Sequence, residues 1–265
     1  MKYKVIFLLL LFLVLTPAWQ SEKADDAQLI RVYDDFLNRI RQEKLPAEIE
    51  KRVVENLERS TVFEPETIDY SIQKTNLFSR EENDIILQVN HSYKYKWQGI
   101  NQNQFYVFQH QANDTYTEKR YEEHKWMEYE IAELTGDGKV ELILITNDSG
   151  NGYTYEPVQI LSCHSGEIAV IFEEILRAYG YLPFKQVQGN HFYKISFDND
   201  YEFVPNRNGT KDILFSSKIF EREDEILLEG QTRFVFQQTN YLPDGEYFDY
   251  RSLSKIGRAS CRERV

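Results

Sequence analysis

The chain has 265 residues, a formal net charge of −12, and 17 Phe and 18 Tyr residues. An acidic surface repels phosphate groups, so a general nucleic-acid binder is disfavoured. The length is sufficient for one large hydrophobic core or two small ones, and the aromatic content favours β-strands.

The first 18 residues have the pattern of a secretory signal peptide. A short positive start (Met1 to Lys4) precedes an unbroken apolar run from Val5 to Leu15, which ends at Thr16-Pro17-Ala18. An apolar helix of that length rises only about 17 Å, roughly half of the hydrocarbon core of a membrane. We therefore expect cleavage near Ala18, no stable membrane span afterwards, and a secreted, periplasmic or cell-envelope location. An uncleaved anchor is the alternative.

Residues 25–60 are predicted to form a helical hairpin. Between Asp25 and Lys44, apolar side chains recur at steps of three and four, which is typical of an amphipathic helix; they are Leu29, Val32, Tyr33, Phe36, Leu37 and Ile40. Pro46 interrupts the pattern and can start a second helix that runs to about Arg59. Because both signs of charge are present, we expect this pair to pack on a core and not on a membrane surface.

Residues 61–255 are predicted to form an antiparallel β-rich domain, because short runs rich in β-branched and aromatic residues follow one another. Residues 113–125 and 147–152 are expected to be loops, and residues 173–179 one or two helical turns. No period of 20 to 50 residues repeats, which argues against a full propeller. The predicted fold class is α+β, a helical hairpin followed by a β-rich domain. The expected strands are Thr61–Phe63, Ile68–Ile72, Ile85–Val89, Tyr93–Trp97, Phe105–Phe108, Trp126–Ala132, Leu142–Ile145, Val158–Ser162, Ile168–Phe172, Phe192–Phe197, Tyr201–Val204, Ile213–Ser216 and Thr232–Gln237.

The stretch from Glu133 to Glu141 places oxygen-bearing groups at alternate positions around an Asp-Gly turn. Such a curled loop can direct carboxylates, a hydroxyl and a carbonyl oxygen towards a hard cation such as calcium. Leu144 stands where an EF-hand requires a Glu, and the flanks read as strands, so an EF-hand is excluded. The candidate metal ligands are Glu133, Thr135, Asp137, Lys139 through its carbonyl oxygen, and Glu141.

This stretch resembles a single degenerate FG-GAP/VCBS-type repeat, the calcium loop of integrin-like β-propeller blades, which occurs in bacterial exported proteins. Leu134 to Glu141 carry the resemblance together with the Gly-rich run Ser149 to Gly152, and it extends over residues 126–172. Glu133 and Thr135 stand where the family has acidic Asp ligands. The resemblance implies a structural calcium ion, and an Asp-Gly hairpin that keeps its shape without the ion is the alternative.

Residues 256–265 resemble the translation of a common sequencing adapter and are excluded from the expected fold. They contain Cys261, so Cys163 is the only cysteine left in the expected domain. A single cysteine forms no intramolecular disulfide, and stability is then expected to come from the hydrophobic core.

Other candidate sites are weaker. Glu122-Glu123-His124 could hold a metal or act as acid and base, but neighbouring residues in a strand face opposite ways. Cys163-His164 is expected to be a buried cysteine beside a turn and not a nucleophile with its base. Ser149 lacks the flanking glycine of a nucleophile elbow. The Tyr93–Trp97 run could stack sugars or bases, but a half-buried strand is favoured.

These features together predict an exported, non-enzymatic binding or structural module of the cell envelope or secreted fraction. Its expected partner is an unidentified protein or glycan, with calcium as the one expected cofactor. The alternative is a secreted hydrolase with a carboxylate-based site.

Overall fold

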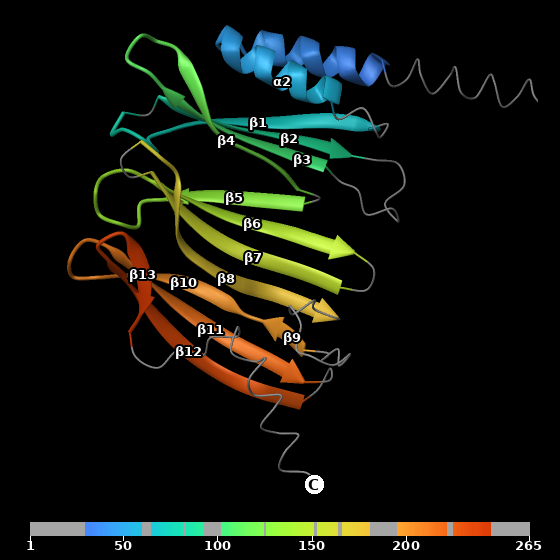
Figure 1. The fold of residues 1–265 in the computed structure, drawn as a ribbon. Helices are drawn as coiled ribbons and strands as arrows, with labels where there is room; N and C mark the ends of the chain where they lie inside the picture. The colour runs from blue at the N-terminus through green and yellow to red at the C-terminus, as the bar shows by residue number, and fades with distance from the viewer. Residues whose placement is uncertain are drawn as a thin grey trace, which may run out of the picture.

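The computed structural model describes residues 30–59, 65–81, 83–92, 102–124, 126–150, 153–163, 166–180, 195–221 and 225–244. Within these ranges, two N-terminal helices are followed by two antiparallel sheets of four and nine strands (Figure 1). The predicted α+β class is therefore confirmed. The signal-peptide pattern, the strands predicted at Thr61–Phe63 and Tyr93–Trp97, and the adapter-like end lie outside the described residues.

The helical hairpin consists of a helix over residues 30–42 and α2 (Ala47–Arg59). Pro46 stands just before α2, and its carbonyl oxygen accepts hydrogen bonds from the backbone N–H groups of Ile49 and Glu50. The acidic residues in the first turn, Glu48 and Glu50, lie at the positive end of the helix dipole. The predicted hairpin and its proline boundary are confirmed.

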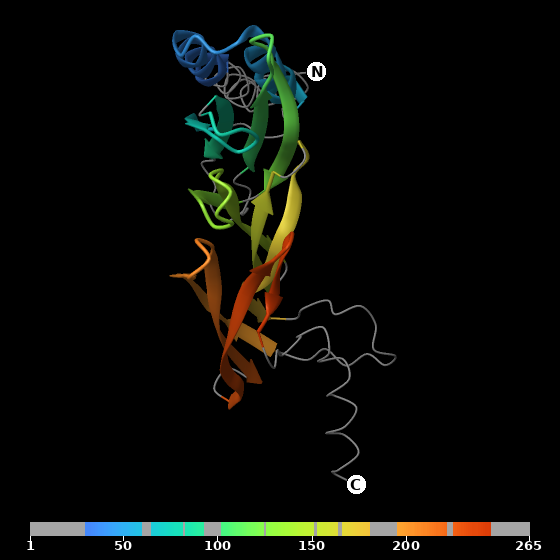
Figure 2. The same cartoon turned by 90° about the vertical axis from the view of Figure 1, so that its left-hand side faces the viewer.

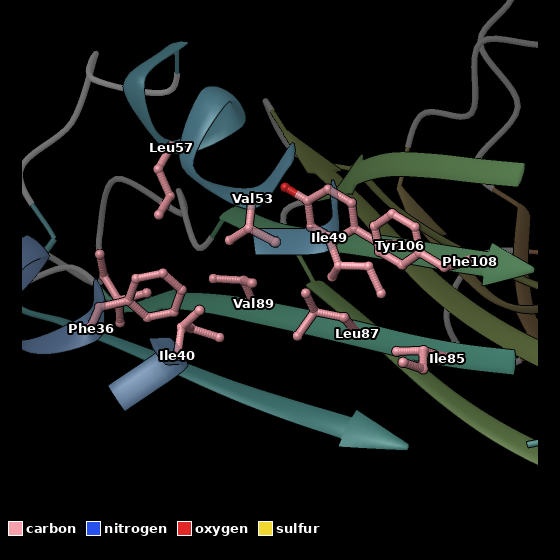
Figure 3. Packing of buried hydrophobic residues seen from close by; sticks show 11 residues of the cluster. Phe36, Ile40, Ile49, Val53, Leu57, Ile85, Leu87, Val89, Tyr106 and Phe108 are labelled. Atoms are coloured by element: carbon pink, nitrogen blue, oxygen red, sulfur yellow. The ribbon is translucent and has the colours of Figure 1, made fainter. Parts of the chain in front are cut away.

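The four-stranded sheet has the order β1-β2-β3-β4. Its strands are β1 (Thr67–Thr75), β2 (Asp84–Ser92), β3 (Gln102–His110) and β4 (Tyr116–His124). Because side chains alternate along a strand, one face packs under the helices and the other faces the second sheet. Figure 3 shows the first interface, where Phe36 and Ile40 of the first helix lie beside Val89, and Ile49 of α2 lies beside Leu87 and Tyr106.

The loop predicted over residues 113–125 is wrong for most of its length, because β4 occupies Tyr116–His124. This strand is polar because its neighbours offer charged partners. Arg52 of α2 donates to Glu118 with an Nε to Oε2 distance of 2.7 Å, and the backbone N–H of Tyr116 donates to the Glu48 carboxylate at 2.8 Å. The polar composition of this stretch led to the loop prediction, but its hydrogen-bond partners on α2 stabilise a strand.

The nine-stranded sheet has the order β13-β12-β11-β9-β8-β7-β6-β5, with β10 paired to β11. Figure 2 shows the molecule as an elongated stack with the helices at one end and the C-terminal strands at the other. The strands are β5 (Trp126–Ala132), β6 (Glu141–Gly150), β7 (Tyr153–Ser162), β8 (Ala169–Gly180), β9 (Ile195–Asp198), β10 (Asp200–Pro205), β11 (Lys211–Glu221), β12 (Glu225–Gln237) and β13 (Asn240–Pro243).

Two other local predictions are corrected here. The helical turns predicted over residues 173–179 are part of β8, which pairs with β7 as far as Gly180. The register shifts between Glu156 and Pro157, and Ile175 and Leu176 are both buried, so the period-two pattern is interrupted. The loop predicted over 147–152 begins later, because β6 continues to Gly150.

Two cores flank the first strands of the nine-stranded sheet. Leu142, Leu144 and Leu161 pack against Phe105 and Val107 of the four-stranded sheet. On the other face the sheet curves, so that Leu134, Phe172, Phe234 and Tyr241 share a second core. No helix among the described residues is both long and apolar enough to cross a membrane.

Candidate functional site

The predicted cation loop connects β5 to β6, and the two strands pair from Ala132–Glu141 onward. Gly136 and Gly138 adopt positive φ values of 75° and 81°, which glycine reaches without steric cost. The Asp-Gly hairpin expected from the sequence is therefore present.

Glu141 organises the interior of this loop, and only 1% of the residue is exposed. Its Oε2 accepts hydrogen bonds from the backbone N–H groups of Leu134 (2.7 Å) and Thr135 (3.3 Å). Its Oε1 accepts from the Thr135 hydroxyl (2.9 Å) and the Ser162 hydroxyl (3.2 Å). Burial raises the pKa of this carboxyl, and the nearby Asp137 charge acts in the same direction, although the hydrogen bonds oppose both. Four protein donors thus occupy both oxygens.

The other predicted ligands bond mainly to the loop itself. Glu133 accepts from the Gly138 N–H at 3.3 Å, and Asp137 accepts from the Lys139 N–H at 2.9 Å. The Lys139 side chain donates to the Cys163 carbonyl oxygen at 3.4 Å. In the described parts of the chain, no group of three or more His, Cys, Asp or Glu side chains is arranged to hold a metal ion.

A calcium ion requires six to eight oxygen ligands, but N–H and O–H groups point at the Glu141 oxygens. The arrangement therefore favours the structural hairpin that is stable without an ion, and calcium binding stays a prediction.

The loop also contacts the turn between β10 and β11. The Lys211 N–H donates to the Leu134 carbonyl oxygen at 2.7 Å, and the Tyr241 hydroxyl donates to the Lys211 carbonyl oxygen at 2.7 Å. A Cβ on Gly136 would lie 3.1 Å from the Gly209 carbonyl oxygen. The hairpin thereby links the first strands of the curved sheet to its C-terminal strands.

Glu122 and His124 lie two residues apart on one face of β4 and contact each other at 2.9 Å. Arg120 pairs with the same carboxylate, whereas Glu123 accepts from Gln102. Burial alone would raise the pKa of Glu122, but the bond from His124 and the charge of Arg120 lower it below its usual value. These residues line an open groove of about 740 Å³. Sequence reasoning had considered neighbouring residues and missed this pairing.

Cys163 is a core residue, as expected. Only 3% of it is exposed, and burial raises the pKa of its thiol to about 12, so the thiolate needed for nucleophilic attack is scarce near neutral pH. His164 lies outside the described residues, and Ser149 pairs with Thr154 in the β6–β7 ladder.

A second cavity lies where the two sheets meet, and we call it the inter-sheet cavity. It has a volume of about 430 Å³. Its described lining comes from β2, β3, β5 and β6 and consists of Gln88, Asn90, His91, Ser92, Asn103, Trp126, Met127, Glu128, Tyr129, Glu130, Ile143 and Ile145.

The β5 wall of the inter-sheet cavity follows from strand alternation. Trp126, Glu128 and Glu130 share one face of β5. Glu128 and Glu130 lie opposite Ile145 and Ile143 of β6. Trp126 is half-buried, whereas both glutamates are exposed at the rim.

The wall from the four-stranded sheet is buried and polar. Gln88 donates to the Met127 carbonyl oxygen at 3.0 Å, which fixes β2 against β5. His91 alternates with Gln88 and Asn90 along β2, so its side chain lies on the helix-covered face with Leu87 and Val89. It is only 2% exposed, and burial lowers its pKa to about 4. Asn103 is also buried. Sequence reasoning missed this cavity, although polar residues at Gln88 and Asn90 inside an apolar strand were a signal.

Comparison with protein-family models, with curated proteins and with solved structures finds no match for this chain. The FG-GAP/VCBS resemblance therefore rests on the motif alone.

Proposed function

We propose that this protein is an exported, non-enzymatic binding module of the cell envelope or secreted fraction, with its ligand site in the inter-sheet cavity. The observation that carries this proposal is a cavity of ligand size that combines buried hydrogen-bonding side chains with an aromatic rim. Binding sites for small molecules typically have this combination of apolar surface and a few fixed polar groups.

Rigidity supports a binding role, because ordering a flexible site costs affinity. The polar groups sit on strands and not on loops, and the Gln88–Met127 hydrogen bond joins the two sheets. The rings of Phe105 and Tyr129 pack at a centroid distance of 5.4 Å beside this bond. The site is therefore held in one geometry before a ligand arrives.

In this proposal the loop of residues 133–141 has a structural role and takes no part in ligand binding. Its central carboxylate is buried and bonded to four protein donors. The signal-peptide pattern of residues 1–18 and the lone Cys163 agree with an exported protein that relies on its core.

The alternative, a secreted hydrolase, has one observation in its favour, which is the Glu122–His124 contact in the groove. A carboxylate that orients a histidine is a common arrangement for a general base. An activity screen on the wild type and on Glu122→Gln tests it, because turnover that this change abolishes would replace the binding proposal.

Ligand-observed NMR of the mature chain with a library of small polar and aromatic compounds tests the proposed site. We expect hits whose signals weaken in Trp126→Ala and in Glu130→Gln but not in Gln159→Ala, a matched control in the groove. Circular dichroism melts establish that each variant is folded. Hits that all three variants bind equally, or no hits at all, would contradict the proposal.

A further inference from the structure

The charges and hydrogen-bonding groups of the inter-sheet cavity indicate the class of its ligand. We infer that the cavity binds a neutral glycan, a polyhydroxylated sugar chain with one or more rings inside it. This inference rests on the proposed function and deepens it by naming the ligand class.

Charge disfavours anionic ligands. Among the described residues that line the cavity, Glu128 and Glu130 carry negative charge and none is Lys or Arg. The whole chain has a net charge of −12, so its field also repels anions. A phosphorylated, sulfated or uronic-acid ligand would find no positively charged side chain among the described lining residues.

The buried part of the cavity favours hydroxyl groups over ammonium groups. The Gln88 and Asn103 amides have both donors and acceptors. A sugar hydroxyl also donates and accepts, so it can match either end of an amide, whereas an ammonium group only donates. Glu128 and Glu130 are exposed to water, so their attraction for a cation is screened, while each carboxylate can still accept from hydroxyls.

The remaining lining fits the other surface of a sugar ring. Trp126 provides a flat aromatic face, and Ile143 and Ile145 provide apolar contacts. The axial C–H groups of a pyranose form an apolar face that can pack on an indole ring, while its hydroxyls point towards polar side chains. The β5–β6 wall of the cavity therefore combines apolar contacts with two carboxylates at the rim, and the β2–β3 wall is hydrogen-bonding.

The test uses three sets of probes added to the mature chain in isothermal titration calorimetry. They are neutral oligosaccharides (the gluco-, xylo-, manno- and N-acetylglucosamine series), the cation spermine, and a sulfated disaccharide. We expect at least one neutral series to bind with measurable heat. Its affinity should fall by about tenfold or more in Trp126→Ala and in Asn103→Ala, because each change removes about 1.4 kcal/mol or more of contact, and stay unchanged in Gln159→Ala.

Three outcomes overturn the inference in distinguishable ways. Spermine or the sulfated disaccharide binding in place of the neutral sugars, with the same loss in Trp126→Ala, would refute the glycan class and leave the binding site intact. Neutral sugars that bind equally well to Trp126→Ala would place the site elsewhere. No binding by any neutral series, together with hits from the compound library at Trp126, would refute the glycan class alone.

Discussion

Removing the Glu141 carboxylate should destabilise the protein far more than an ordinary carboxylate substitution. In Glu141→Ala, the backbone N–H groups of Leu134 and Thr135 lose their acceptor in a buried place. An unsatisfied buried donor costs about 1–3 kcal/mol, so the two together cost about 2–6 kcal/mol. The Thr135 and Ser162 hydroxyls can rotate, and their loss adds less. Domains are stable by only about 5–15 kcal/mol, so this variant approaches the unfolding threshold.

Glu141→Gln is the matched comparison. Its carbonyl oxygen can still accept from the two backbone N–H groups, and its amide can donate to the two hydroxyl oxygens, which accept as well as donate. The expected cost is about 1 kcal/mol, roughly the net value of one hydrogen bond. The same truncation to alanine at the exposed Glu133, which accepts one bond at 3.3 Å, should destabilise the protein by less than about 1 kcal/mol.

Urea denaturation at neutral pH measures the free energy of unfolding of all four proteins. The expected order of stability is wild type, Glu133→Ala and Glu141→Gln close together, and Glu141→Ala clearly last. If Glu141→Ala were no less stable than Glu133→Ala, the buried carboxylate would not organise the loop, and the reasoning would fail.

Three further predictions concern the same fold. Gly136→Ala should lower the free energy of unfolding by about 2–4 kcal/mol, because φ is positive and the new Cβ would lie 3.1 Å from the Gly209 carbonyl oxygen. Gly166→Ala, where φ is 81° and the Cβ meets open space, should lower it by about 1 kcal/mol. Equal urea midpoints for the two variants would contradict this. Burial lowers the pKa of His91 from 6.5 to about 4, so between pH 6.5 and pH 4 this histidine is protonated in the unfolded chain but neutral in the folded protein. Stability should therefore fall by up to about 3 kcal/mol as the pH drops from 6.5 to 4, and a His91→Gln variant that shows the same slope would refute this cause. Calcium added after EDTA should leave the melting temperature of wild type and Asp137→Asn unchanged, and a saturable rise in the wild type alone would instead support the calcium loop.

The helices were predictable because their information is local. Phe36, Ile40, Ile49 and Val53 recur at helical spacing, and Pro46 marks the boundary between the two helices. Strand β4 was missed because its stabilising partners, such as Arg52, are distant in the sequence. The first part of β8 was predicted as the strand Ile168–Phe172, but residues 173–179 were missed because the register shift beside Pro157 breaks the alternation that a regular strand would show.

The candidate sites differ in the same way. The hairpin of residues 133–141 was visible from spacing, but the role of Glu141 was not, because one of its partners, Ser162, belongs to β7. The inter-sheet cavity could not be predicted, since Gln88 and Met127 meet from different sheets, 39 positions apart in the chain. A sequence pattern reports which face a residue takes, and only the packing of two sheets shows which faces meet.

The most direct test of the account follows the indole N–H resonance of Trp126 while neutral oligosaccharides are added to the isotope-labelled protein. The account predicts a saturable shift of this resonance with at least one series, and loss of the shift in Asn103→Ala, which lies on the opposite wall. A Trp126 resonance that stays fixed through every series would contradict a glycan site in the inter-sheet cavity.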